Sequence, residues 1–101
     1  MRYTRTSSLD NVAATPADAI GYIQFDDALP AIGAFPDEVM TRRIWPGKGE
    51  FDLAGFAHAV KATGYAGVIS VELLNESWRH DGLRPAEFAR RAMQTALPYW
   101  R

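Results

Sequence analysis

The run "GVISVELL" at residues 67–74 limits the possible folds more than any other stretch of this sequence. From Val68 onward its residues favour a β-strand, and apolar side chains fall on both alternating faces until Glu72. Continuous apolarity of this kind is typical of a strand in a parallel sheet that is covered on both sides. The sequence therefore predicts an α/β fold in which a buried strand ends in an acid.

A second strand and two helices are predicted around this run. Residues 20–25, "IGYIQF", are β-branched and aromatic enough for a strand. Apolar residues at helical spacing predict a helix from Leu53, with Asp52 as its N-cap and Gly64 after its last turn. A final helix is predicted to begin at Pro85 and to stop at Pro98.

The two remaining segments have weaker signals. Residues 1–19 are polar and small, and we expect a lead-in with at most one helical turn at residues 14–18. Residues 26–51 have neither helical nor alternating periodicity. A connection of this length in a compact domain is usually functional or disordered.

The predicted order of elements gives two βα units in 101 residues. Two parallel strands are stable only inside a larger sheet that is covered on both faces. The length suits one domain and is too short for two. We therefore expect further strands to come from another copy, from another chain or from the rest of a longer protein.

Composition excludes several classes of function. A net charge of −1 with interspersed signs gives no electrostatic footprint for nucleic acid, and no basic run indicates a membrane surface. The absence of cysteine removes disulfides, thiolate metal sites and thiol catalysis, and it fits a reducing compartment. The stretch "MRYTRTSSLDNV" has no apolar h-region, and no segment approaches the ~18 apolar residues of a membrane span. We expect a cytoplasmic protein with a small-molecule or protein partner.

Several motifs, taken in order, resemble the C-terminal quarter of the xylose-isomerase-like TIM barrels. They are "YIQFDDA" at residues 22–28, "TRRIWPGKGEFDLAGFAHAVKATGYAGVISVELL" at residues 41–74, and the closing helix. The resemblance covers residues 20–97 of a partial domain at residues 1–101. It implies the last two βα units of a (β/α)8 barrel, whose usual length of about 250 residues is incomplete in this chain.

The resemblance also implies a metal site. Glu72 matches a strand-end glutamate that ligates a divalent metal in the family, and a carboxylate suits Mn²⁺, Mg²⁺ or a Zn²⁺-like ion. The alternative is a solvated acid at the end of the strand. Gln24 takes a position where the family often has a metal-binding histidine. Its weaker amide ligand could complete the metal site or only bind substrate.

Two pairs of adjacent charged residues flank this site in the motif. Asp27 matches a family aspartate that supports the loop or a neighbouring metal ligand, whereas we expect Asp26 to be solvated. Neighbouring strand residues point to opposite faces, so the two acids are not a catalytic pair by adjacency alone. Either Arg42 or Arg43 is the forked donor that the family uses for a substrate hydroxyl, carboxylate or phosphate, unless both are solvated loop charges.

Other candidates are weaker. Trp45 and Trp78 could form apolar walls for a sugar ring, although loop tryptophans more often pack the rim of a barrel. His58 is expected on the exposed face of its helix, and the family does not require a histidine at His80. The "GKGE" segment lacks the spacing of a phosphate-binding loop, so Lys48 is not read as a nucleotide lysine.

The leading hypothesis is the C-terminal part of a metal-dependent sugar or sugar-acid isomerase or epimerase, with Glu72 among the metal ligands. Proton removal α to a carbonyl would pass through an enediolate, and dehydratase or hydrolase-like chemistry stays open. The alternative is a truncated, non-enzymatic module that is stable only as a homo-oligomer or with a partner chain. The isolated chain is expected to be inactive. An endonuclease of the same superfamily would need basic charge and clustered histidines, which this sequence lacks.

Overall fold

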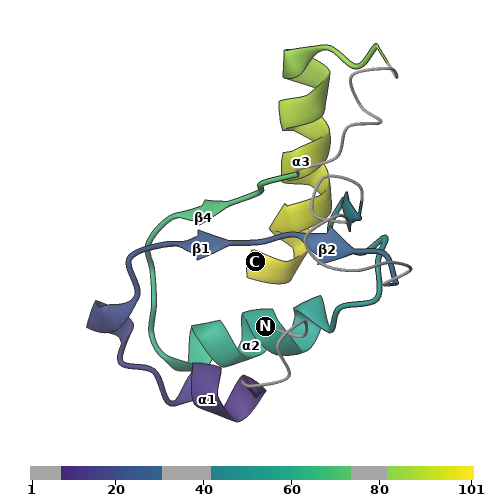
Figure 1. The fold of residues 1–101 in the computed structure, drawn as a ribbon. Coiled ribbons are helices and arrows are strands. Elements are labelled where there is room, and N and C mark those ends of the chain that lie inside the picture. Colours follow the sequence, from purple (N-terminus) through teal and green to yellow (C-terminus); the bar gives the residue numbers. More distant parts are fainter. Residues whose placement is uncertain (1–7, 31–41, 74–81) are drawn as a thin grey trace.

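The computed structural model describes residues 8–30, 42–73 and 82–101, and its elements follow the predicted βαβα order with additions (Figure 1). They are α1 (Leu9–Ala13), the 3₁₀ turn η1 (Ala17–Ala19), β1 (Ile23–Gln24), β2 (Asp27–Ala28), β3 (Arg43–Ile44), α2 (Leu53–Ala62), β4 (Ile69–Ser70) and α3 (Pro85–Trp100).

Strands β1 and β4 form a parallel pair, in which Ile23 lies opposite Ile69 and Gln24 opposite Ser70. The backbone N–H of Phe25 donates to the carbonyl of Ser70 at 2.7 Å and extends the pairing by one step. The predicted parallel arrangement is confirmed, but each strand is far shorter than its apolar run. Because the two strands are parallel, their C-terminal ends lie at the same end of the sheet.

The signals at the ends of α2 are confirmed. The carboxylate of Asp52 accepts the backbone N–H of Gly55 at 2.9 Å, and Gly64 has a φ of +81° beyond the last turn. The predicted stop at Pro98 is wrong, because α3 continues to Trp100. Proline removes only its own N–H and crowds the preceding turn. The rings of Tyr99 and Trp100 pack on Phe25, at 5.4 and 5.0 Å between centroids, and this packing holds the last turn.

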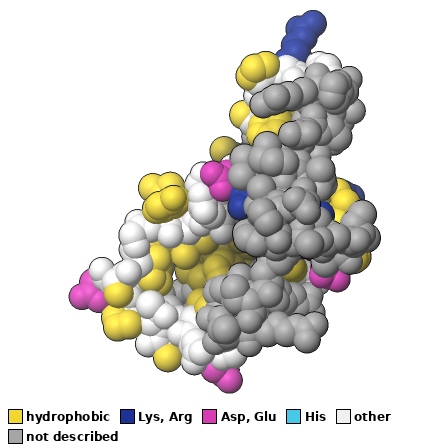
Figure 2. Space-filling model, in the orientation of Figure 1, with side chains coloured by type: hydrophobic (Ala, Val, Ile, Leu, Met, Phe, Trp, Pro, Cys, Tyr) yellow, Lys and Arg dark blue, Asp and Glu magenta, His cyan; other side chains and the backbone are white. Residues whose placement is uncertain are grey.

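The core lies on one face of the strand pair, where Phe25 packs with Leu53 of α2 and Ala96 of α3. Figure 2 shows apolar side chains gathered in a hollow of the visible face, in the space that Figure 1 draws between the strands and α2. The opposite strand face is open: Tyr22 is 59% and Val68 67% exposed. We expected apolar cover on both faces, and within the described residues the helices cover one.

Two features were not predicted. Ser8 caps α1 by accepting the backbone N–H of Asn11 at 3.3 Å, and α1 packs against α2 (Figure 1). Strands β2 and β3 pair antiparallel, with Ala28 opposite Arg43, inside the segment expected to lack regular structure. This second pair fixes the direction in which the Arg43 side chain leaves the backbone.

Within the described ranges, none of the helices combines the length and the hydropathy that a membrane crossing requires.

Candidate functional site

Two acids and an arginine meet where β1 and β4 end. Asp26 follows Gln24 by two residues and Glu72 follows Ser70 by two, so the register brings both acids to the same edge. The backbone N–H of Glu72 donates to Asp26 Oδ1 at 2.6 Å. Arg43 Nη1 donates to Glu72 Oε2 at 2.6 Å, to the Glu72 carbonyl at 3.2 Å and to Asp26 Oδ2 at 3.3 Å. These three residues are called the strand-end cluster below.

The strand-end cluster is half-buried and carries an excess of negative charge. The side chain of Asp26 is 14% exposed, that of Arg43 29% and that of Glu72 42%. Burial raises the pKa of the Asp26 carboxyl above the usual aspartate value, whereas the Glu72 N–H and the Arg43 charge lower it and the Glu72 charge raises it. The expectation that Asp26 is solvated is therefore wrong. The sequence held part of the signal, because an acid follows each strand, but the pairing of Asp26 with Glu72 depends on the strand register.

Asp27 points to the opposite side and binds a loop. Its Oδ2 accepts the backbone N–H groups of Gly47 at 3.0 Å and Gly49 at 2.9 Å, and its Oδ1 accepts those of Phe51 at 3.0 Å and Ala28 at 2.9 Å. The residue is 1% exposed. A Cβ on Gly49 would contact the Asp27 carboxylate and the Ala28 carbonyl, so this turn requires glycine. Asp27 thus organises the loop, while its support of a metal ligand stays a prediction.

The two arginines of the motif have different surroundings. The Arg43 side chain reaches the strand ends, whereas Arg42 is 4% exposed and its backbone carbonyl accepts the Leu29 N–H at 2.9 Å. Adjacent residues of β3 and its flank point to opposite sides. Of the pair, Arg43 is the one placed to meet a ligand at the strand-end cluster.

Gln24 is exposed on β1, in register with Ser70. It shares a strand face with Asp26, because residues two apart on a strand point to the same side. Its role as a metal ligand or substrate contact stays a prediction, as does the ligation of metal by Glu72.

Comparison with known proteins decides the family. The family model described as the xylose isomerase-like TIM barrel matches residues 3–97. The chain belongs to this family. The predicted fold, a part of a TIM barrel with parallel βα units, is thereby confirmed.

Two curated proteins that are similar to this chain carry the same name. A 3-dehydroshikimate dehydratase of Pseudomonas putida is 40% identical over 65 residues, which is 63% of this chain and 10% of that protein. The protein of the same name in Pseudomonas aeruginosa is 39% identical over 79 residues, 73% of this chain and 12% of that protein. The chain therefore spans about a tenth of the length of these relatives.

Solved structures show the same partial coverage. A crystal structure described as the IOLI protein with a binding zinc atom has a TM-score of 0.75 and 29% identity, over 94% of this chain and 33% of that one. A xylose isomerase-like TIM barrel/4-hydroxyphenylpyruvate dioxygenase fusion protein has a TM-score of 0.71 and 28% identity, over 96% of this chain and 15% of that one.

The zinc atom of that similar structure raises the question of whether the strand-end cluster fits a metal. Carboxylate oxygens of Asp26 and Glu72 converge on one cationic group, Nη1 of Arg43, which is the arrangement that a hard cation needs from its donors. Within residues 8–30, 42–73 and 82–101, no three acids, histidines or cysteines form a metal cluster. The pair fits part of a ligand set, and the other donors would come from outside the described residues.

Trp45 serves packing at the rim of the barrel. It is 8% exposed, its ring lies 5.0 Å from that of Phe88, and the Arg91 guanidinium stacks over it at 5.5 Å. These contacts favour the rim interpretation over a sugar-binding wall and anchor the segment after β3 to α3. His58 is exposed on α2 as predicted. Trp78 and His80 lie outside the described residues.

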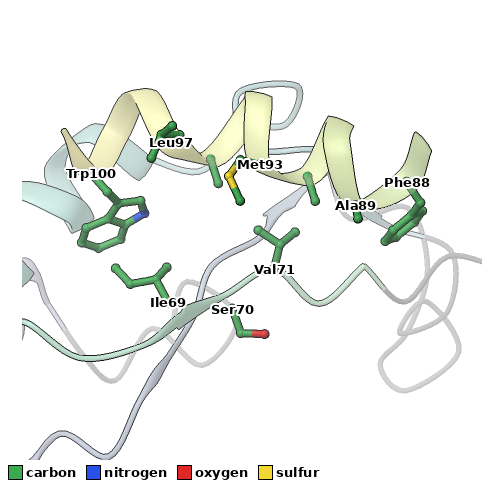
Figure 3. A pocket seen from close by; sticks show the side chains of 10 residues that line it. Ile69, Ser70, Val71, Phe88, Ala89, Met93, Leu97 and Trp100 are labelled. Atoms are coloured by element: carbon green, nitrogen blue, oxygen red, sulfur yellow. The ribbon is translucent and has the colours of Figure 1, made fainter. Parts of the chain in front are cut away.

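An open apolar groove of about 500 Å³ lies between β4 and α3 (Figure 3). Ile69 and Val71 point toward α3, while Ser70 points away from it (Figure 3). On the helix side, Met93 is 62% and Leu97 38% exposed. No lining residue of this groove is charged, so it can bury apolar groups and has no means for acid or base chemistry.

Proposed function

We propose that this chain supplies the C-terminal part of a metal-dependent enzyme that removes a proton α to the carbonyl of a small sugar or sugar acid. The observation that supports the proposal is the convergence of Asp26, Arg43 and Glu72 where two parallel strands end. The C-terminal ends of the strands form the face at which TIM-barrel enzymes keep their active sites.

Each member of the cluster has a separate task. A bound divalent cation would stabilise the negative charge that develops on the substrate oxygens when the proton leaves. Glu72 would hold that cation with one carboxylate, and Asp26, fixed by the Glu72 N–H, would add a second oxygen. Arg43 would orient an anionic or hydroxyl group of the substrate, and Gln24 would offer its amide on the same strand face.

Two outcomes of proton removal are candidates. Return of the proton to another position or face of the enediolate gives an isomerase or epimerase, which is the reaction expected from the sequence. Loss of a β-hydroxyl instead forms a carbon–carbon double bond, and the proton and hydroxide leave as water. The names of the two curated relatives favour this dehydratase outcome as the second candidate. Both outcomes share the first step.

Calorimetric titration with Mn²⁺ tests the metal part of the proposal. We expect the chain to bind Mn²⁺ and the Glu72→Gln variant to lose that binding, because an uncharged amide is a poor substitute for a carboxylate ligand. Glu87→Gln, which removes an exposed acid from the first turn of α3, is the matched control. Equal binding by Glu72→Gln and the control would remove Glu72 from the metal site.

Proton NMR in D₂O separates the two reactions. Deuterium that appears at the α-carbon of a sugar acid without loss of water supports an isomerase or epimerase. Formation of a carbon–carbon double bond from a keto acid that has a hydroxyl β to its ketone supports a dehydratase. Because the isolated chain is expected to be inactive, the measurement uses protein in which further βα units accompany this chain, with diamagnetic Mg²⁺. Neither change in that protein would favour the non-enzymatic alternative.

That alternative, a module completed by a copy of itself or by a partner chain, is favoured by the open strand face. Tyr22 and Val68, which directly precede β1 and β4, are largely exposed, and the groove beside Met93 is apolar. Light scattering during gel filtration is the test. A specific oligomer would support the module, and a stable monomer would contradict our expectation that two βα units need further strands.

A further inference from the structure

We propose that the Arg43 guanidinium occupies the cation position between Asp26 and Glu72, so that a divalent cation must displace it from Glu72 in order to bind. The inference rests on the proposed metal site and concerns the order of events there. Arg43 is then a positioning residue whose guanidinium fills the site when no metal is bound.

The contacts of one nitrogen carry the proposal. Arg43 Nη1 has three oxygen acceptors: a carboxylate oxygen of Glu72 at 2.6 Å, the Glu72 backbone carbonyl at 3.2 Å and a carboxylate oxygen of Asp26 at 3.3 Å. Converging carboxylate and carbonyl oxygens are the donors that hard cations take in proteins. Nη1 therefore lies at the point that these three oxygens of Asp26 and Glu72 share as hydrogen-bond acceptors.

The two cations cannot share that point. A hard divalent cation binds carboxylate oxygen at about 2.0–2.6 Å, and Nη1 already lies 2.6 Å from Glu72 Oε2. A metal bound there would approach the guanidinium to within van der Waals contact. Like charges so close repel strongly in a half-buried site. A divalent cation at the position of Nη1 and the Arg43–Glu72 ion pair are thus mutually exclusive.

The surrounding structure lets the side chain leave while the backbone stays. The side chain of Arg43 is 29% exposed. Its neighbour Trp45 is packed against Phe88 beneath Arg91, and Asp27 holds the turn that follows. Replacement of the guanidinium by the metal therefore needs only a rotamer change of Arg43. The displaced guanidinium remains beside the site, where it can bind a substrate carboxylate.

Mn²⁺ calorimetry on Arg43→Gln tests the exclusion. Removal of the competing cation is expected to tighten Mn²⁺ binding about three- to tenfold, the range that partly exposed ion pairs and charged hydrogen bonds provide. Arg90→Gln, which removes one positive charge from the exposed face of α3, is the control for net charge and should change the affinity less than about twofold.

A second measurement needs no variant. Diamagnetic Mg²⁺ added to the unsubstituted chain should accelerate solvent exchange of the Arg43 guanidinium protons in ¹⁵N NMR, because the ion pair that protects them is broken. Exchange at Arg90 should not change. Unaltered protection of Arg43 at saturating Mg²⁺ would overturn the inference, even if Arg43→Gln failed to fold.

The outcomes separate this inference from the metal proposal. If Glu72→Gln abolishes Mn²⁺ binding while Arg43→Gln leaves it equal or weaker, the exclusion is wrong and the metal site stands. If neither the unsubstituted chain nor Arg43→Gln binds Mn²⁺, both proposals are overturned. Tighter binding in Arg43→Gln, with release of the guanidinium protons by Mg²⁺, supports both.

Discussion

Asp26 and Asp27 are chain neighbours with opposite surroundings. Asp27 is buried and its carboxylate accepts backbone N–H groups from the Gly47–Phe51 turn, so fixed main-chain donors hold its oxygens. Asp26 faces Arg43 and Glu72 in a half-buried cluster, where burial raises its pKa. The strand thus separates a carboxylate that holds the fold from one that is available for a ligand.

The difference shows what each carboxylate can do. The partners of Asp27 are main-chain groups in a glycine turn, which cannot be exchanged for a ligand without loss of the turn. The partners of Asp26 are a flexible guanidinium and one N–H, and at least the guanidinium can move away. Three predictions test this contrast, from the largest expected effect to the smallest.

Asp27→Ala should give the largest effect. It leaves backbone N–H groups of the turn without their acceptor, and we expect the free energy of unfolding to fall by about 3 kcal/mol. Urea denaturation followed by circular dichroism measures the change. Asp18→Ala, at an exposed acid of η1, is the control and should cost less than about 0.5 kcal/mol. A loss at Asp27 no larger than the control's would show that the turn is held by other contacts.

Gly49→Ala should have a medium effect. A Cβ at this position would contact the Asp27 carboxylate and the Ala28 carbonyl, and we expect a loss of about 2 kcal/mol in thermal or urea unfolding. Gly21→Ala is the matched substitution, because its Cβ would meet no atom within 4 Å. It should be neutral or stabilise by up to about 1 kcal/mol. Equal effects of the two substitutions would contradict the close approach at Gly49.

The pH dependence of Asp26 should give the smallest effect. Its pKa is raised in the folded state, so the folded chain holds this proton more tightly than the unfolded chain. The stability of the unsubstituted chain, measured relative to Asp26→Asn, should therefore fall as pH rises from the usual aspartate pKa through the raised one, and stay constant above it.

Carboxyl ¹³C NMR measures the titration of Asp26 directly. Arg43→Gln should move the Asp26 midpoint further upward, because the Arg43 charge lowers this pKa. A midpoint of Asp26 at or below the usual aspartate value would contradict the effect of burial.

Local signals in the sequence predicted the local structure well. Asp52 and Gly64 bound α2 because capping depends on a few neighbouring residues. Pro98 misled the prediction, since distant packing of Tyr99 and Trp100 on Phe25 outweighs a local helix breaker. The pairing of β2 with β3 had no local signal, because two-residue strands show no alternation.

The candidate site could be predicted only in part, because its assembly depends on long-range strand pairing. Motif resemblance pointed to Glu72 and Asp27, but the choice between Arg42 and Arg43 depends on the register of β2 and β3. The inclusion of Asp26 depends on the register of β1 and β4, which places it beside Glu72. Both registers are long-range properties that composition and periodicity leave open.

The parallel pairing of β1 with β4 has a consequence for symmetry. The two outer edges of this pair belong to different strands, β1 and β4. A two-fold axis can pair either edge antiparallel with the same edge of a second copy, which gives an isologous dimer, whereas addition of β1 of one copy to β4 of the next is heterologous. Such addition either closes into a ring or continues as an open fibre, and the sheet twist decides which.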